Sequence, residues 1–467
     1  MKNSTNLLIS ERETWFLGKF AAFLFFLIFT VSQTYSQTWS PIGGGTNWEY
    51  SLVVYNNQLY AGMQSGNGGS GLFRFDGVNW SNVGSINGTV QALTVYNGNL
   101  IVGGSFSSAG GLAVLNIAQY DGSTWSDVGG GPDNIVSALT VYNGDLIVGG
   151  YFTTVEGVGA NYIAKYNGTN GWQPLGSGTG GGQGQVMALT TWNGNLIAGG
   201  FFTTAGGTTV NHIAQWNGTS WSALGSGTNS IVYALGNYAN NLVAGGLFSS
   251  AGGVSANCVA SWNGSTWSAL GGGCGGGYYP YVFAFANYGT DLYIGGLYTT
   301  AAGQTVNGIS RWDGSVYHAM GNPPGFSSGG SNVYGAFALT VYNGGLVAGG
   351  IFSTAGGIGA GNVAMWDGLT AVKNVNGKVP YNFKLDQNYP NPFNPSTKIG
   401  FALPKAGNVE LKVYDILGKE VATLVNDFRQ AGSYEITFDA SKLTSGLYFY
   451  KLTTGSFSSV RKMMLVK

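Results

Sequence analysis

An internal repeat constrains this sequence more than any other feature. Most copies contain two adjacent glycines directly after an apolar run, and the second glycine recurs at steps of 46, 50, 46, 50 and 54 residues. These glycines are Gly104, Gly150, Gly200, Gly246, Gly296 and Gly350. A weaker first copy has Ala61-Gly62 in place of the pair. Seven copies of this length predict a repeat architecture in which each copy is one supersecondary unit packed against its neighbours.

The turn residues within a copy predict four antiparallel strands. In the second copy, β-rich runs at 92–96 and 100–104 flank Asn97-Gly98, and runs at 117–120 and 124–128 flank Asp121-Gly122. These dipeptides favour tight hairpins because both turn residues adopt positive φ. The 81 glycines and the 8% of charged residues also fit an all-β chain with many turns. Four strands per copy correspond to one blade of a β-propeller.

The two ends of the repeat region predict how the ring closes. The seventh copy stops at Asp367-Gly368, before the tryptophan-containing strand that ends the other copies. Residues 38–45 match residues 124–131, so the missing strand lies at the N-terminal end. We therefore predict an all-β seven-bladed propeller closed by an N-terminal strand, which leaves no unpaired blade. An open β-solenoid is the alternative fold, and it has no need of a split copy.

The paired glycines after an apolar strand and the tryptophan further on resemble kelch and galactose-oxidase-type propeller repeats. This resemblance spans residues 39–368, although the longer Ala-Gly-Gly loop departs from the kelch pattern. It implies a propeller fold. A copper site of the galactose oxidase kind would need two tyrosines and two histidines, and His212 and His318 are the only histidines of the chain. The resemblance therefore extends to the fold and not to the activity.

The N-terminus and the charge distribution predict the domain boundaries. Lys2, Arg12 and Lys19 precede or flank an apolar run at 20–31, which predicts a signal peptide over residues 1–37; an uncleaved anchor is the alternative. Residues 38–370 contain ten acidic and three basic side chains, whereas residues 371–467 contain seven acidic and thirteen basic ones. This break predicts a propeller at 38–370, a linker at 371–382 and a second domain at 383–467. No basic stripe appears, so we expect no binding of nucleic acid.

The histidines and cysteines predict structural roles. His212 occupies a position that holds five residue types in six copies, which indicates a variable loop position. His318 follows Tyr317, which replaces the tryptophan of the outer strand. Cys258 and Cys274 form either one disulfide in an oxidising compartment or two buried thiols.

The acidic residues give no clear catalytic group, and we expect a protein that is not an enzyme. A glycosidase-type carboxylate pair would have to come from Asp133, Asp145, Glu156 and Asp291. No Ser-His-Asp grouping, Cys-His pair or phosphate-binding loop is present. We expect no cofactor, with calcium bound by the glycine-rich loops as the alternative.

The loops before each first strand vary between copies and are predicted to gather on one face of the ring. The last two contain five aromatic side chains among glycines, which suit contact with carbohydrate or protein. These predicted ligand-binding residues are Tyr278, Tyr279, Tyr281, Phe326 and Tyr334. The alternative is that they anchor their loops.

A proline-rich stretch at 387–397 precedes short alternating strands over the last seventy residues, which predicts an Ig-like β-sandwich. This region closely resembles the type IX (Por) C-terminal sorting domain of Bacteroidota. The matching motif residues are Asn388, Tyr389, Pro390, Asn391, Pro392, Phe393, Asn394, Pro395, Gly418, Gly446, Lys462 and Lys467. The resemblance implies recognition by the outer-membrane translocon, removal by a sortase-like peptidase, and release or attachment to surface lipopolysaccharide. An accessory Ig-like domain is the alternative.

We therefore expect a secreted or cell-surface propeller that binds a glycan, matrix or protein ligand. A hydrolase or lyase acting on extracellular polysaccharide, and a purely structural surface component, are the alternatives. The sequence leaves open the identity of the ligand and whether the protein stays on the cell.

Overall fold

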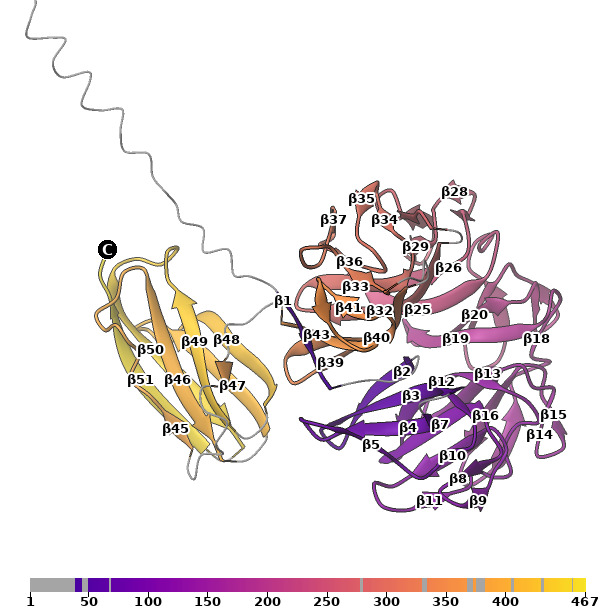
Figure 1. Ribbon diagram of the computed structural model, residues 1–467. Helices are drawn as coiled ribbons and strands as arrows, with labels where there is room; N and C mark the ends of the chain where they lie inside the picture. Colours follow the sequence, from indigo (N-terminus) through magenta and orange to yellow (C-terminus); the bar gives the residue numbers. More distant parts are fainter. Residues whose placement is uncertain are drawn as a thin grey trace, which may run out of the picture. The chain divides into compact units, whose positions relative to one another are not determined.

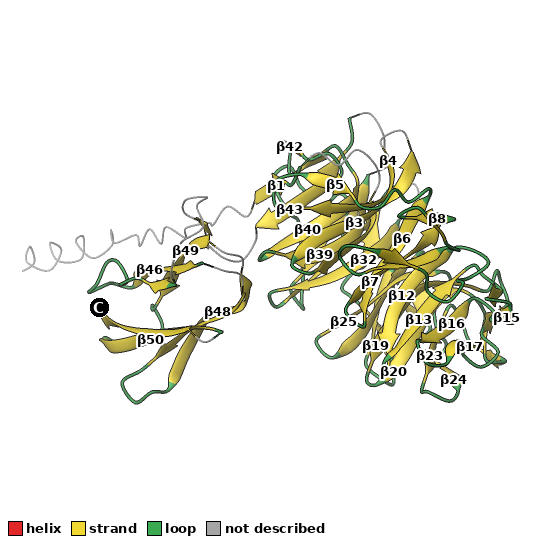
Figure 2. Ribbon diagram, turned by 90° about the horizontal axis from the view of Figure 1, so that it is seen from below, coloured by secondary structure: helices red, strands yellow, loops and turns green. Residues whose placement is uncertain are grey.

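The computed structural model describes residues 38–43, 49–66, 69–277, 280–329, 334–367, 373–374, 383–404, 407–429, 432–455 and 457–467. Over these residues the chain forms strands and loops and contains no helix (Figure 2). It follows that none of the described residues form a helix able to cross a membrane. The predicted signal peptide and most of the predicted linker lie outside the described residues.

Seven four-stranded antiparallel sheets lie within the described part of residues 38–367, and all have the same strand order. The first strands are β2 (Glu49–Tyr55), β6 (Thr89–Tyr96), β12 (Val136–Tyr142), β19 (Gln185–Trp192), β25 (Val232–Tyr238), β32 (Tyr281–Tyr288) and β39 (Gly335–Tyr342). The second strands are β3 (Gln58–Gly66), β7 (Asn99–Ser105), β13 (Asp145–Gly150), β20 (Asn195–Phe201), β26 (Asn241–Gly246), β33 (Asp291–Leu297) and β40 (Gly345–Ile351).

The outer half of each sheet follows the same plan. The third strands are β4 (Gly69–Phe75), β10 (Ile117–Tyr120), β16 (Ile163–Asn167), β23 (Ile213–Trp216), β29 (Val259–Trp262), β36 (Ile309–Trp312) and β43 (Val363–Asp367). The fourth strands are β5 (Trp80–Asn82), β11 (Trp125–Ser126), β17 (Gly171–Pro174), β24 (Trp221–Ala223), β30 (Trp267–Ala269), β37 (Tyr317–His318) and β1 (Thr38–Pro41). The Asn-Gly and Asp-Gly turns therefore join the strands that the sequence predicts.

The first strands face one another around a centre, in chain order (Figure 1). Each first strand contacts the first strand of the next sheet, and β2 contacts β39, so the series of contacts returns to its beginning. We number the sheets one to seven after these strands, from β2 to β39. Their faces pack on each other through buried aliphatic and aromatic side chains, which form one cluster after another around the ring.

The paired glycines lie where the backbones approach most closely. A Cβ atom on Gly149 would come 2.5 Å from Cγ1 of Val186, in the next sheet. A Cβ atom on Gly150 would meet the backbone carbonyl oxygen of Ile135, the residue directly before the first strand of its own sheet. Only a residue without a side chain fits at these two positions, which is why the pair recurs in the repeats.

The N-terminal strand completes the seventh sheet, as the truncated last copy predicts. β1 pairs antiparallel with β43, with Thr38 opposite Asp367 and Trp39 opposite Trp366. Trp39 is only 3% exposed and packs 5.1 Å from Phe326, measured between ring centroids.

Hydrogen bonds from aromatic side chains of the fourth strands also connect neighbouring sheets. In six of the seven sheets, as far as the structure describes them, the aromatic side chain of the fourth strand donates to a backbone carbonyl of the preceding sheet, over 2.7 to 3.4 Å. The pairs are Trp80 to Ile42, Trp172 to Val128, Trp221 to Leu175, Trp267 to Leu224, Tyr317 to Leu270 and Trp39 to Met320. β1 and the residue that follows it take part twice, as donor through Trp39 and as acceptor through Ile42.

Short hairpins connect the second and third strands. They are β8 (Ser108–Ala109) with β9 (Leu112–Ala113), β14 (Thr154–Val155) with β15 (Val158–Gly159), β21 (Thr204–Ala205) with β22 (Thr208–Thr209), β27 (Ser250–Ala251) with β28 (Val254–Ser255), β34 (Thr300–Ala301) with β35 (Gln304–Thr305), and β41 (Thr354–Ala355) with β42 (Ile358–Gly359). Three of them gain a strand from the loop before the first strand, namely β18 (Thr179–Gly180), β31 (Cys274–Gly275) and β38 (Phe326–Ser327).

The C-terminal residues form two further four-stranded sheets. One contains β44 (Lys373–Asn374), β49 (Gly432–Asp439), β46 (Ser396–Leu403) and β45 (Lys384–Leu385). The other contains β48 (Glu420–Arg429), β47 (Gly407–Tyr414), β50 (Gly446–Thr454) and β51 (Phe457–Leu465). Alternate side chains of both sheets are buried in one shared core that includes Ile399, Leu411 and Tyr450, as period-two patterning predicts.

Candidate functional site

The aromatic residues predicted to bind a ligand do not form one group. Tyr278 and Tyr279 lie outside the described residues. Phe326 is 2% exposed and stacks on Phe352 at 4.1 Å, so its prediction as a ligand contact is wrong: it is a core residue that anchors its loop. Tyr334 is half-buried against the same core cluster, with its hydroxyl 3.5 Å from Oδ1 of Asn307. The anchoring alternative therefore describes these two residues.

Tyr281 belongs to a different group, at the inner edge of the ring. Its ring lies 5.5 Å from Phe283 and 5.7 Å from Tyr233. Phe283 lies 5.3 Å from Tyr233 and 5.2 Å from Phe337, and Phe337 stacks on Tyr50 at 5.8 Å. We call these five half-buried residues the aromatic arc. They connect sheets five, six, seven and one without a break.

A repeated irregularity in the first strands positions the arc. Each first strand has a register shift against the second strand after its first or second residue, which leaves one residue unpaired. The unpaired residues are Tyr50, Gln91, Ser137, Met187, Tyr233, Phe283 and Phe337. Because the first strands contact one another around the ring, equivalent side chains of neighbouring sheets can meet, as Tyr233, Phe283, Phe337 and Tyr50 do. Four of the seven are aromatic, and all four belong to the arc.

Tyr50 and Tyr233 of the arc remain neutral hydrogen-bonding groups at physiological pH. Burial raises the pKa of Tyr50, and burial together with neighbouring Tyr281 and Tyr151 raises the pKa of Tyr233. The hydroxyl of Tyr50 donates to Oε1 of Gln64 over 3.1 Å. Next to the sheet-five end of the arc, the hydroxyl of Tyr151, which directly follows β13, lies 3.5 Å from the sulfur of Met187 in β19. The arc thus combines apolar ring faces with phenol donors.

The other end of the first strands carries a cavity of about 740 Å³. It is lined by the last residues of β12, β19, β25 and β32 and by the hairpin turns that follow them. Asn287 Nδ2 donates to the backbone oxygen of Asn237 over 2.8 Å, and Asn237 Nδ2 donates to that of Thr191 over 3.0 Å. These bonds tie sheets six, five and four together at equivalent positions. We call this space the hairpin-side cavity.

The four candidate carboxylates have separate structural partners. Asp133 accepts hydrogen bonds from the backbone N–H groups of Thr153 and Thr154, which lower its pKa although partial burial opposes this. Asp145 forms an ion pair with Lys165 at 3.2 Å. It lies at the opposite end of its sheet from Asp133.

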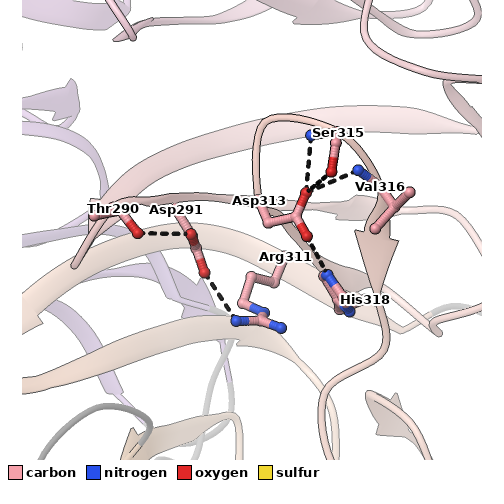
Figure 3. Close-up of polar contacts among 7 residues, drawn as sticks. All are labelled: Thr290, Asp291, Arg311, Asp313, Ser315, Val316 and His318. Carbon is pink, nitrogen blue, oxygen red and sulfur yellow. Dashed lines mark hydrogen bonds and ion pairs between the residues drawn. The ribbon is translucent and has the colours of Figure 1, made fainter. Parts of the chain in front are cut away.

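Asp291 is the equivalent of Asp145 in sheet six, where Arg311 pairs with it at 2.8 Å and Thr290 donates to its other oxygen (Figure 3). The fourth candidate, Glu156, is exposed at a hairpin turn with a φ of 50°. Asp145 and Asp291 share one position in the repeat, and each forms an ion pair with a basic residue of the third strand. None of these contacts joins two of the four carboxylates.

The same close-up shows what His318 does. Its Nε2 lies 2.7 Å from Oδ2 of Asp313, in the turn between the third and fourth strands (Figure 3). That contact and the backbone N–H groups of Val316 and Ser315 lower the pKa of Asp313. His318 therefore braces a turn, as the structural interpretation predicts.

His212 occupies a position that is left-handed in every comparable copy. The residues there are Asn116, Tyr162, His212, Cys258, Gly308 and Asn362, with φ between 59° and 83°. His212 is buried and stacks on Phe201 at 5.8 Å, and burial lowers its pKa while a backbone hydrogen bond with Gly200 opposes this shift. The position is defined by its backbone, which explains why its side chain varies.

Both cysteines are free thiols in the structure and both are buried. Burial raises the pKa of Cys258 to about 12 and that of Cys274 well above its usual value. Cys258 donates through Sγ to the backbone oxygen of Pro280, in the loop before the next first strand. Among the described residues no group of three or more His, Cys, Asp or Glu side chains is arranged to hold a metal.

The proline-rich motif of the C-terminal region is fixed to both sheets. Asn388 is 2% exposed, with Nδ2 donating to Thr397 Oγ1 and its backbone N–H to the Tyr450 hydroxyl. Phe393 is buried in the shared core and exchanges backbone hydrogen bonds with Met464 and Val466.

The remaining motif residues lie at the surface or in turns. Tyr389 is 80% exposed, and Pro390, Asn391, Pro392, Asn394 and Pro395 are exposed beside it. Oδ1 of Asn391 accepts a hydrogen bond from the backbone N–H of Met464, and the Pro395 carbonyl oxygen accepts one from the backbone N–H of Ala440. Gly418 lies in the turn after β47, Gly446 opens β50, Lys462 is exposed on β51, and Lys467 donates through Nζ to the Ser441 carbonyl.

Most of the arc was missed in the sequence. The prediction looked for aromatic residues in the variable loops, whereas four of the five arc residues are the unpaired residue of a first strand. Aligning the copies on the tyrosine or tryptophan that ends each first strand, and reading the residue five positions before it, would have found these four.

Comparison with known families agrees with the fold. Residues 387–467 match the secretion system C-terminal sorting domain, and residues 143–171 match a β-propeller domain of unknown function. No curated protein sequence matches the chain.

Two examples illustrate the solved structures that are similar to this chain. One is PorZ, described as an essential bacterial surface component of the type IX secretion system of Porphyromonas gingivalis, with 15% identity and a TM-score of 0.43. The match covers 91% of this chain and 60% of PorZ, so the chain spans about three fifths of that protein. The other is a fungal alcohol oxidase in complex with copper, with 13% identity, a TM-score of 0.41, and coverage of 92% of this chain and 100% of the oxidase.

The sorting domain implies interaction with the type IX secretion system, since it is the address that this system reads. This chain is therefore a β-propeller protein exported to the cell surface or the extracellular space by means of its C-terminal sorting domain.

Proposed function

We propose that this protein is a non-enzymatic binding protein, a seven-bladed propeller closed by its N-terminal strand, whose ligand contacts the aromatic arc. The ligand is a glycan, a matrix component or a protein met outside the cell. The pairing of β1 with β43 and the return of contacts from β39 to β2 support the blade count.

The uneven chemistry of equivalent positions carries this proposal. The unpaired residues of the first strands have the same backbone setting in all seven sheets. If these positions served only the packing of the propeller, similar residues would be expected at all seven. Instead the aromatic side chains lie in adjacent sheets, whereas Gln91 and Ser137 lie in sheets two and three. Grouped, half-exposed rings are typical of binding surfaces because they offer large contact area at low entropic cost.

The sorting partners belong to the same proposal. We propose that residues 383–467 form an Ig-like sandwich that the outer-membrane translocon recognises and a sortase-like peptidase removes. Residues 38–370 are the cargo, which is released or attached to surface lipopolysaccharide. The shared core of the two C-terminal sheets and the rigid placement of Asn388 and Phe393 support a preformed recognition surface.

The test compares the intact protein with a Tyr233→Ser/Phe283→Ser variant on arrays of glycans and matrix proteins. Serine is the residue at the equivalent position Ser137, so the fold should tolerate it. We expect the variant to lose binding by at least about tenfold, because buried ring contacts concentrate binding energy. The matched control is Gln91→Ala, which should bind as the intact protein does. Absence of any ligand, or equal binding by the double variant, would overturn the proposal.

A further inference from the structure

The hairpin-side cavity is a second surface, at the opposite end of the first strands from the aromatic arc. In β25, for example, Tyr233 is the second residue and belongs to the arc, whereas Asn237 and Tyr238 are the last two residues and line the cavity. A volume of about 740 Å³ lies within the range of small-molecule sites. The two surfaces can therefore be tested separately.

The cavity is polar but uncharged. Its described lining residues include five asparagines, two threonines, two tyrosines and a tryptophan, and none carries a charge. The nearest charged side chain in the chain order, Asp291, is already paired with Arg311 at 2.8 Å. An ionic ligand would find no counter-charge there, so the lining favours a neutral ligand that exchanges hydrogen bonds.

Equivalent positions again differ around the ring. The second-to-last residue of each first strand lies opposite a leucine of the second strand in all seven sheets. Sheets four, five and six have Thr191, Asn237 and Asn287 there. The other four sheets have valines, namely Val54, Val95, Val141 and Val341. Since valine serves the fold in four sheets, the polar side chains of the other three call for another explanation.

The amides are held in place and still have free capacity. Each of Asn237 and Asn287 is exposed and uses one amide N–H in the bond to the neighbouring strand. An amide has a second N–H and a carbonyl oxygen for other partners. Trp192, whose Nε1 donates to the Asn240 carbonyl over 3.1 Å, fixes the turn beside them. A row of oriented donors and acceptors next to the wall residue Val141 matches a molecule with hydroxyls on its edge and C–H groups on its face.

We propose that the hairpin-side cavity binds a neutral saccharide, with Thr191, Asn237 and Asn287 recognising its hydroxyl groups. Adjacent donor and acceptor groups of an amide suit vicinal hydroxyls, which also donate and accept. Export places the cavity where extracellular polysaccharides are present. This binding is independent of the aromatic arc and does not require that the arc binds the same ligand.

The experiment measures binding of neutral tetrasaccharides of glucose, mannose, xylose and galactose to the full-length protein, by saturation-transfer NMR and calorimetry. A tetramer of galacturonic acid and an uncharged tetrapeptide are the competing probes. We expect at least one neutral tetrasaccharide to bind and the two competitors to bind weakly or not at all. No neutral tetrasaccharide bound at millimolar concentration, or equal binding of either competitor, would overturn the proposal.

The decisive variant is Asn237→Val/Asn287→Val, which introduces the residue found at the equivalent positions of four sheets. It should fold with a similar melting temperature and bind the tetrasaccharide at least about tenfold more weakly, the effect of losing roughly one hydrogen bond's worth of net affinity per amide. Thr191→Val serves as a second, milder variant should the double variant be unstable. Tyr233→Ser/Phe283→Ser is the control and should leave this affinity unchanged, so loss of arc binding and loss of cavity binding are distinguished. Unchanged affinity in both cavity variants would refute the assignment.

Discussion

Gly149 and Gly150 allow the sheets to pack closely because glycine has no side chain. Gly149 leaves room for Val186 of the next sheet, and Gly150 leaves room for the Ile135 carbonyl oxygen at the start of its own sheet. This purpose follows from the sequence, because a recurrent Gly-Gly after an apolar strand indicates close backbone approach. The particular neighbour of each glycine does not follow, because it depends on the packing angle between two sheets.

A single added methyl group tests this. Gly150→Ala places a Cβ atom against the Ile135 carbonyl oxygen. We therefore expect the free energy of unfolding to fall by about 1–3 kcal/mol and the melting temperature to be clearly lower. The control is Gly168→Ala, where no atom lies within 4 Å of the added Cβ. Equal melting temperatures for the two variants would contradict the role assigned to the pair.

His212 gives a pH-dependent prediction. Burial lowers its pKa in the folded protein, so the unfolded chain binds a proton more readily and stability falls as the pH drops below about 6.5. His212→Asn, the residue found at the equivalent Asn116 and Asn362, should flatten the dependence of unfolding free energy on pH between about 7 and 5. Denaturant titrations at several pH values measure this, and above pH 8 both proteins should show the same slope. A variant as acid-sensitive as the parent would contradict it.

At the scale of elements, aromatic side chains of the fourth strands donate hydrogen bonds to the preceding sheet, and β1 contributes one of these donors through Trp39. Trp39 is buried between sheets six and seven and its Nε1 lies 3.4 Å from the Met320 carbonyl. β1 pairs with β43, the strand that the truncated last copy leaves without its outer partner. The match of residues 38–45 with 124–131 was sufficient to predict it, because strand identity can be read from a repeat.

Trp39→Ala should therefore destabilise the ring strongly. Removing a buried tryptophan costs about 3–5 kcal/mol, and the seventh sheet would lose its main contact with its completing strand. Thermal unfolding followed by tryptophan fluorescence measures the change. Ser40→Ala, a half-buried neighbour on the same strand, is the control and should behave as the parent. A melting temperature unaffected by Trp39→Ala would show that β1 does not hold the ring.

The aromatic arc was not predicted at this scale. The Asn-Gly turns indicate where strands begin and end, but the unpaired residue of each first strand arises from a register shift that no turn dipeptide reveals. The prediction for Phe326 is wrong for a different reason. Its loop gains the short strand β38, which pairs with β41 and buries the ring.

For the whole molecule, the sorting domain and the ring have separate tasks. Deleting residues 383–467 should leave a folded ring that remains in the periplasm, because the address read by the secretion system is gone. Cell fractionation and protease accessibility of intact cells measure the location. The full-length chain at equal expression and the melting temperature of the truncated chain are the controls. Normal surface display of a folded truncated protein would contradict this prediction.

The sequence motifs were most informative about this address, since several spaced motifs agree with a matched family model. They were least informative about the ligand, because both candidate surfaces are built from single positions contributed by different copies. Only the ring brings those positions together.

The closing strand also has a mechanical consequence. Any pull transmitted through the C-terminal part enters the ring at Asp367, the last residue of β43. Without β1 that strand would be an edge, held by β40 alone. With β1 in place it is clamped by hydrogen-bonded ladders on both sides, so the strand that would bear the tension on a tethered protein is an interior one.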